Sequence, residues 1–259
     1  MATEDINKLG TTVNWWENFF HGVALDFWRA AISDEQTHAE ADFINQQLQL
    51  PVRAAILDVP CGNGRLAIEL AAFGFKLTGV DIATEFIAEA EKNCAARNVD
   101  ITWKNLDMRK LAATNEFDGA FCFGNSFGYL DDAGNAEFLK ALSRTLKVGA
   151  RFIIDAPAIA ECLLPHVLEE RTIQLGDITA TIDTRYDHEQ ARMFNDFTFT
   201  RNGIDDRRPS SQRIYTYHEL AELLRAAKLE PVAAYGSLNG EPFKLGAQRL
   251  LLVTEKVEG

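Results

Sequence analysis

Residues 56–66 combine a carboxylate with a glycine turn, and a second carboxylate follows at a fixed distance. A short apolar run ends at Asp58 and opens into a turn that contains Gly62 and Gly64. A second apolar run ends at Asp81, which is 81 − 62 = 19 residues after Gly62. The glycines let the backbone approach a ligand closely, and a carboxylate at the end of a second strand can accept both hydroxyls of a ribose. The spacing therefore predicts a nucleoside-binding edge of an α/β sheet.

The same turn also fits the dinucleotide fingerprint G-x-G-x-x-A, with Gly62, Gly64 and Ala67 at its fixed positions. This match predicts an NAD(P)-dependent oxidoreductase as an alternative. Two features count against it. Pro60 stands two positions before Gly62, where its ring fixes φ near about −65° and removes a donor. More than fifty residues also precede the motif, which usually opens its domain. The oxidoreductase alternative is weakened but stays open.

The elements that must position these residues show a regular pattern from residue 54 onward. Short apolar runs alternate with amphipathic segments, which is typical of repeated βαβ units and a mostly parallel sheet. Apolar residues at helical spacing predict crossover helices around residues 66–73, 86–94 and 138–146. The five strands that we expect lie near residues 54–59, 75–80, 101–106, 117–123 and 150–156.

The pattern changes after Pro165, where hairpin turns separate four predicted strands. Because a meander cannot be another crossover unit, we interpret it as a β insertion, followed by a helix near residues 218–228. Residues 202–209 and 239–246 are rich in turn residues and are the candidate linkers. The strands expected in this half lie at residues 171–175, 178–186, 193–201 and 213–217, and after the helix at 231–236 and 247–255.

Composition limits the partners of the chain. Its 259 residues carry a formal net charge of −12, and binding of nucleic acid relies on clustered Lys and Arg, so we expect no nucleic-acid partner. The four cysteines are widely spaced, with no CxxC pair and no His cluster, so we expect reduced thiols and no metal site. No stretch resembles a signal peptide or a membrane span, which predicts a soluble, cytoplasmic protein without a membrane partner.

Five ordered segments resemble the motifs of the class I S-adenosylmethionine-dependent methyltransferases. Five ordered matches are far more specific than one glycine loop. The segments are residues 57–64 (similar to motif I), 81–82 (the ribose-binding end of the second strand), 105–109 (the end of the third strand), 117–123 (the fourth strand) and 146–152 (the approach to the fifth strand).

This resemblance implies a Rossmann-like, doubly wound α/β sheet of seven strands with the last strand antiparallel. The β insertion and residues 126–130 are similar to the small-molecule branch of the family, which includes sugar amine N-methyltransferases. The segments implied are an N-terminal helical cover at 1–50, a cofactor-binding α/β core at 51–157, a β insertion over the active site at 158–217 and a C-terminal completion of the core at 218–259.

The resemblance also implies S-adenosyl-L-methionine as the cofactor and assigns residues to it. Structural alternatives remain: Asp81 is also a good helix N-cap, and the aromatic cluster around Trp15 and Trp16, with Phe19 and Phe20, is also typical of a helical core rather than a lid. The residues implied are Asp58 for the ammonium group, Pro60, Gly62 and Gly64 in the loop under the methionine portion, Asp81 for the ribose, Ile82, Asp107 and Met108 for the adenine, Phe123 beside the sulfonium and Trp16 in a lid.

For the reaction itself, alignment and close approach matter more than a strong acid. Tyr129 is the first candidate for steering the acceptor or accepting its proton, and His218, Asp155 and Glu241 are further candidates. The sequence thus predicts methyl transfer to a nitrogen or oxygen of a small molecule. The alternatives are the oxidoreductase and a non-catalytic S-adenosylmethionine-binding protein. The small molecule is the only partner expected, and a homodimer is left open.

Overall fold

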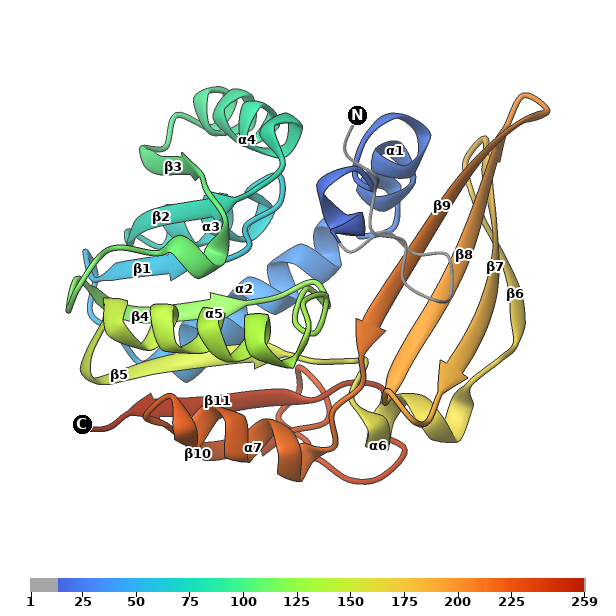
Figure 1. Ribbon diagram of the computed structural model, residues 1–259. Coiled ribbons are helices and arrows are strands. Elements are labelled where there is room, and N and C mark those ends of the chain that lie inside the picture. The colour runs from blue at the N-terminus through green and yellow to red at the C-terminus, as the bar shows by residue number, and fades with distance from the viewer. Residues whose placement is uncertain (1–13, 259) are drawn as a thin grey trace, which may run out of the picture.

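The computed structural model describes residues 14–258 and contains two β-sheets (Figure 1). The larger sheet has seven strands in the order β10-β11-β5-β4-β1-β2-β3. Strands β1 to β5 run parallel, and β11 runs antiparallel to both of its neighbours. This confirms the fold class expected from the sequence. The strands are β1 (Ala55–Asp58), β2 (Lys76–Asp81), β3 (Ile101–Asn105), β4 (Phe117–Cys122), β5 (Leu146–Asp155), β10 (Leu229–Tyr235) and β11 (Leu251–Lys256).

Helices cover both faces of this sheet, and the side chains of β1 alternate between them. Ile56 belongs to the apolar cluster that includes residues of α2 and α3, whereas Leu57 belongs to the cluster that includes residues of α5 and α7. Both are fully buried, as expected for a parallel strand between two helical layers. The helices are α2 (Asp34–Leu48), α3 (Arg65–Ala72) and α4 (Thr84–Arg97) on one side and α5 (Asp132–Thr145) and α7 (Tyr217–Ala226) on the other.

Local sequence decides where two of these helices begin. Asp131 Oδ1 accepts the backbone N–H of Gly134 at 2.7 Å at the start of α5. Thr216 and Glu219 form a reciprocal capping box at the start of α7. Such caps satisfy N–H groups that have no partner within the helix. Because α5 begins at a cap, residues 123–131 are left as a loop at the carboxyl end of β4.

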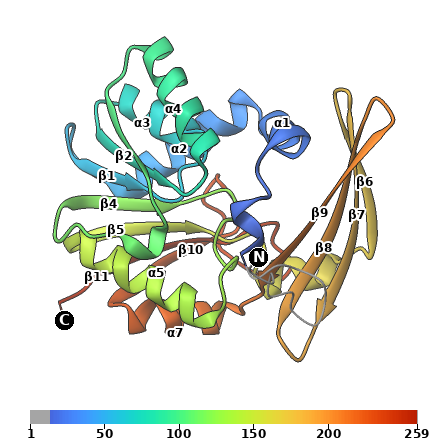
Figure 2. The same cartoon turned by 45° about the horizontal axis from the view of Figure 1, so that its top comes forward.

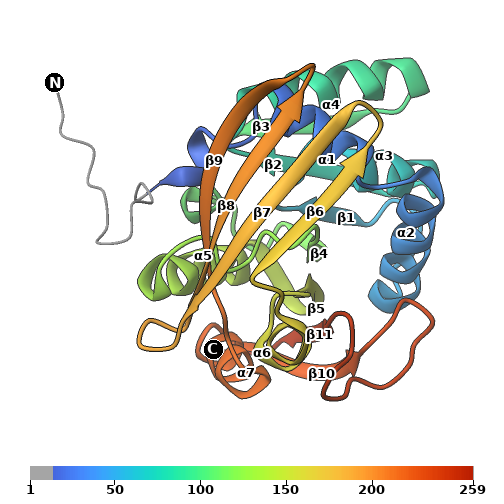
Figure 3. The same cartoon turned by 90° about the vertical axis from the view of Figure 1, so that its right-hand side faces the viewer.

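The smaller sheet is an antiparallel meander of four strands, seen from its outer side in Figure 3. Its apolar face packs against the N-terminal segment, in a cluster that joins Phe197 and Phe199 to Trp15, Phe19 and Phe27. Figures 1 and 2 show α1 between α4 and β9. The elements are η1 (Trp15–Glu17), α1 (Gly22–Ala30), β6 (Glu170–Leu175), β7 (Ile178–Asp187), β8 (Arg192–Arg201) and β9 (Ile204–Arg213), with α6 (Ala160–Leu163), η2 (Met108–Lys110) and η3 (Leu164–His166) as short connections.

The last strand of this meander corrects the sequence-based expectation. Residues 202–209 were expected to be a linker and 213–217 a strand, but β9 spans Ile204–Arg213 and pairs with β8 along its length. Charged residues and Pro209 give this segment the composition of a loop. An edge strand tolerates both, because one side of its backbone needs no ladder hydrogen bonds.

The N-terminal region is more than a cover. Helix α2 contributes Phe43 and Ile44 to the core of the main sheet, so only η1 and α1 lie over the edge of that sheet. Residues 1–13 of the expected cover lie outside the described residues, and the four-segment division stays a prediction. Within residues 14–258, none of the helices combines the length and apolar character needed to cross a bilayer.

Candidate functional site

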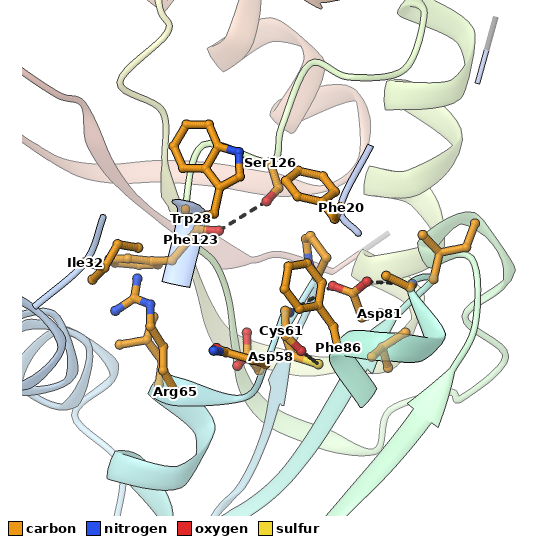
Figure 4. A pocket seen from close by; sticks show the side chains of 18 of the residues that line it. Phe20, Trp28, Ile32, Asp58, Cys61, Arg65, Asp81, Phe86, Phe123 and Ser126 are labelled. Carbon is orange, nitrogen blue, oxygen red and sulfur yellow. Dashed lines mark hydrogen bonds between the residues drawn. The ribbon is translucent and has the colours of Figure 1, made fainter. Parts of the chain in front are cut away.

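A cavity of about 600 Å³ opens at the carboxyl ends of β1, β2 and β4 (Figure 4). Asp58 ends β1, Asp81 ends β2 and Phe123 follows β4, and all three line the cavity. Carboxyl ends of parallel strands are where open α/β sheets bind ligands. Of the twelve site residues expected from the sequence, ten line this cavity: Trp16, Asp58, Pro60, Gly62, Asp81, Ile82, Asp107, Met108, Phe123 and Tyr129.

The Asp81 carboxylate holds the glycine loop in place. Its Oδ2 accepts the backbone N–H of Gly62 and its Oδ1 accepts that of Ala83, each at 2.8 Å. Ala83, not Asp81, is the N-cap residue of α4, so the N-cap alternative for Asp81 is wrong, although Asp81 accepts the N–H of that residue. Each carboxylate oxygen still has a second lone pair, so Asp81 can accept ligand hydroxyls as well.

Gly64 does not line the cavity, and its requirement for glycine comes from a positive φ of 76° and from packing. A Cβ at Gly64 would lie 2.4 Å from Cη2 of Trp103, and one at Gly79 would lie 2.3 Å from Cζ3 of the same ring. The Trp103 indole of β3 therefore supports the glycine loop from the side opposite a ligand. Nothing local in the sequence indicated this contact, because Trp103 lies 39 positions after Gly64 (103 − 64 = 39).

Asp58 is a buried carboxylate that faces the cavity with only 2% of its surface exposed. Burial raises the pKa of Asp58 well above its usual range, and the charge of Arg65 opposes this rise. A buried ionised carboxylate is costly unless a cation offsets it. The site can therefore bind a positively charged group beside Asp58.

A buried network of ion pairs lies behind the glycine loop. Glu40 of α2 accepts from Arg65 at 2.6 Å and from Arg249 at 3.0 Å, and Arg249 also binds Asp155 at 2.6 Å. Asp155 was a candidate base, but it is engaged by Arg249. The network thus connects α2 and α3 to the end of β5 and to the residues just before β11. Arg65, one of its members, lines the cavity. Its partners are too distant in sequence to be recognised from spacing.

Asp107 lies at the end of the cavity that Ile82 and Met108 also line. Its Oδ1 caps η2 by accepting the N–H of Arg109 at 2.9 Å, and its Oδ2 binds the Arg109 guanidinium at 2.6 Å. Although burial acts to raise it, these bonds from Arg109 hold the pKa of Asp107 below its usual value. Asp107 is therefore ionised at neutral pH and can accept a hydrogen bond from a ligand.

The N-terminal aromatic residues fall into two groups. Trp16 and Phe20 line the cavity, and they form its roof together with Trp28 of α1. Trp15 is buried instead in the cluster with the second sheet, and its Nε1 donates to the Ser211 carbonyl at 2.9 Å. Trp16 and Phe20 also pack against that cluster, so they lie between the core and the cavity, and the lid stays a prediction.

The two catalytic candidates lie in different places. Tyr129 lines the cavity, and its ring packs against Trp15 with centroids 4.6 Å apart. Burial, with Cys122 and Asp81 acting in the same direction, raises the pKa of Tyr129, so the phenol is neutral and can orient a ligand but is a poor base. His218 is exposed near the start of α7 and does not line the cavity. The structure therefore corrects its assignment to the site.

Other cavity residues were missed as site residues. Phe86 was recognised only as part of a helix pattern, and Arg65 directly follows the glycine motif but was given no role. Trp28 belongs to the N-terminal aromatic cluster, which was the one signal that could have identified it. Figure 4 shows these side chains converging on the cavity from α1, α3 and α4. Within residues 14–258, no group of three or more potential metal-ligating residues occurs.

Comparisons with known proteins agree with this geometry. Residues 56–149 match a family model described as a methyltransferase domain. A putative methyltransferase from Geobacillus is 30% identical over 167 residues, which cover 63% of this chain and 62% of that relative. The match therefore spans less than two thirds of that relative's length.

Two solved structures share the fold over most of the chain. A S-adenosylmethionine-dependent methyltransferase from Clostridium acetobutylicum has a TM-score of 0.77 at 18% identity, covering 90% of this chain and 96% of the other. An amino pentose methyltransferase from Micromonospora echinaspora has a TM-score of 0.68 at 20% identity, covering 92% and 98%. At such identities the likeness establishes the fold.

Proposed function

Because this chain belongs to the class I S-adenosylmethionine-dependent methyltransferase family, we propose that it uses S-adenosyl-L-methionine to methylate a nitrogen or oxygen of a small molecule. The observation that carries the proposal is the cavity in which the buried carboxylates Asp58 and Asp81 meet at a glycine loop. A dinucleotide enzyme is disfavoured by Pro60 in that loop, and none of the relatives described above is an oxidoreductase.

The residues along the cavity fit the successive parts of this cofactor. Asp58, whose buried charge lacks a full counterion, suits the ammonium group, and Asp81 suits the ribose hydroxyls. Asp107 stays ionised beside Ile82 and Met108, which suits an adenine with its amino group toward the carboxylate. Gly62 lies between the two acids and leaves its surroundings open, with nothing within 4 Å of a Cβ built there.

When bound, the cofactor supplies an activated methyl group with its own leaving group. The contribution of the chain is then alignment and exclusion of water rather than acid catalysis. Phe123 and the roof residues Trp16 and Phe20 form an aromatic wall, and aromatic faces favour a nearby cation. The neutral Tyr129 hydroxyl orients the acceptor by a hydrogen bond. An amine acceptor must therefore react as its unprotonated form, or lose its proton to solvent.

The acceptor we propose is a small molecule because of the size and walls of the cavity. The cavity of about 600 Å³ lies within the range of small-molecule sites and must hold the cofactor as well, so the acceptor has only part of this volume. The lining cations are already paired: Arg65 binds Glu40, Arg29 binds Glu89 and Asp26, and Arg97 binds Glu69. This favours an acceptor without a carboxylate or phosphate group.

Thermal shift measurements with S-adenosylhomocysteine, S-adenosylmethionine, NADH and NADPH test the cofactor. We expect a clear rise in melting temperature with the two adenosyl compounds and none with the nucleotides, because a ligand that binds only the folded state stabilises it. Stabilisation by NADH or NADPH alone would overturn the proposal.

Transfer of a radiolabelled methyl group from S-adenosylmethionine into a metabolite extract tests turnover. Label in a small-molecule fraction supports the proposed reaction. Tight binding of S-adenosylhomocysteine without transfer to any fraction would instead favour a non-catalytic binding protein.

A further inference from the structure

Glu89 of α4 contacts the glycine loop and the roof of the cavity at the same time. Its Oε1 accepts from Asn63 Nδ2 at 3.0 Å, and its Oε2 accepts from Arg29 Nε at 2.7 Å and also from Arg29 Nη2. Asn63 stands between the two glycines of the loop, and Arg29 lies in the last turn of α1. One carboxylate thus joins two elements that line opposite sides of the cavity.

The connection continues from the roof to the second sheet. Arg29 Nη1 donates to Asp26 Oδ1 at 2.8 Å, and Asp26 Oδ2 accepts from Arg201 Nη1 of β8 at 2.8 Å. A chain of polar contacts therefore runs from Asn63 through Glu89, Arg29 and Asp26 to Arg201. Figures 1 and 2 show the order of the elements concerned, with α1 lying between α4 and the second sheet.

An apolar contact supports the same closure. The rings of Phe20 and Phe86 lie 5.6 Å apart, and both line the cavity. Phe86 precedes Glu89 by three residues on α4, so the two side chains share one face of that helix. The roof is therefore attached to α4 at two adjacent points, one aromatic and one charged.

We propose that Glu89 is a positioning residue that holds α1 closed over the bound cofactor and couples the glycine loop to this roof. The inference rests on the proposed function, since the ligand beneath the roof is the cofactor. Glu89→Gln removes the charge that holds Arg29 and leaves one acceptor oxygen for the two donors Asn63 and Arg29, so the roof opens more often. The step affected is the release of the ligand, because the roof must open before the ligand can leave.

The test is stopped-flow measurement of S-adenosylhomocysteine release from the full chain, followed by tryptophan fluorescence, because Trp16 and Trp28 line the cavity. In Glu89→Gln we expect release to be roughly three- to tenfold faster, as for the loss of one partly exposed, charge-assisted contact. Glu91→Gln is the matched control, since it removes the same charge from an exposed position of the same helix. Its release rate should equal that of the unchanged protein.

Arg29→Gln and the double variant complete the test. If the two residues act through their ion pair, the release rate of the double variant should be about that of the faster single variant. If they act independently, the two fold-increases in release rate should multiply. High salt should reduce the difference between the unchanged protein and Glu89→Gln, because this pair is partly exposed and therefore screened. A purely structural effect of the substitution would show neither behaviour.

The outcomes separate the two proposals. If the unchanged protein does not bind S-adenosylhomocysteine, the proposed function fails. If it binds and Glu89→Gln releases at the same rate, or if Glu91→Gln accelerates release equally, the role of Glu89 is overturned. Circular dichroism of each variant without ligand checks that the fold is retained, and multiplicative rates in the double variant also overturn the coupling.

Discussion

Individual side chains at this site make structural contacts and can still accept hydrogen bonds from a ligand. Asp81 fixes the glycine loop through Gly62 while keeping lone pairs for a ligand, and Asp107 caps η2 while keeping its charge. Burial raises the pKa of Asp81 and, more strongly, that of Asp58, where the opposing charge of Arg65 is already paired with Glu40. A carboxylate in that position costs stability until a cationic group binds beside it.

Asp58→Asn should therefore stabilise the protein without ligand and weaken binding of S-adenosylhomocysteine. The pKa of Asp58 is raised in the folded state, so the ionised form disfavours folding as pH rises above about 4, the ordinary value of an unfolded Asp. The stability gain of Asp58→Asn should be present at pH 7 and disappear toward pH 4. Urea unfolding at several pH values and calorimetric titration with S-adenosylhomocysteine measure both effects. Equal stability of the two proteins at pH 7, with unchanged affinity, would contradict this role.

At the scale of elements, η1 and α1 belong to two structures at once. One set of aromatic side chains packs into the second sheet, and the other closes the cavity above β1 and β2. A short helical segment can do this because its side chains point in different directions around its axis. The roof thus packs against the second sheet as well as against α4.

Trp15→Ala and Trp16→Ala should separate these two functions. Trp15 is buried and donates to the Ser211 carbonyl, so its removal should cost about 3–5 kcal/mol of unfolding free energy. Trp16→Ala should change stability much less but weaken S-adenosylhomocysteine binding several-fold, because Trp16 lines the cavity. Chemical denaturation and calorimetry on both variants give the comparison. The reverse pattern would place Trp16 in the core and Trp15 at the ligand.

At the scale of the whole molecule, the second sheet supports the edge of the main one. Gln212 of β9 is buried and its Nε2 donates to the carbonyls of Asn125 and Phe127 at 3.1 and 2.7 Å. Arg192 of β8 donates to the Tyr129 carbonyl at 2.7 Å. The loop that carries Tyr129 into the cavity is therefore held by a sheet far along the chain, so the insertion supports this loop although none of its residues lines the cavity.

Gln212→Ala should loosen this loop. The buried carbonyls of Asn125 and Phe127 lose their donor, at a cost of about 1–3 kcal/mol. Hydrogen–deuterium exchange should rise in residues 124–130. Gln174→Ala, on the exposed edge strand β6, is the control and should leave that exchange unchanged. If exchange in residues 124–130 is equal in both variants, the second sheet does not hold the loop.

The sequence by itself determined the features that depend on neighbouring residues. Apolar runs between glycine turns produced the strands of the main sheet, and Asp58, Gly62 and Asp81 fall at strand ends because the chain must turn there. The resemblance of five ordered segments then indicated the family. At β9 the local composition wrongly predicted a loop. The segment is a strand because its backbone pairs with β8, despite the charged residues and Pro209.

Only the tertiary structure decided which of these residues share the site. It excluded His218, moved Gly64 from ligand contact to packing on Trp103, and joined Glu40 to Arg249 across 209 positions. It also buried Tyr129 against Trp15 at the cavity, which raises the pKa of a phenol that is already neutral at pH 7. Burial, ion pairing and closure of the cavity all arise between segments far apart in the chain. Residue types and spacing could therefore identify candidate residues but could not show which of them lie together.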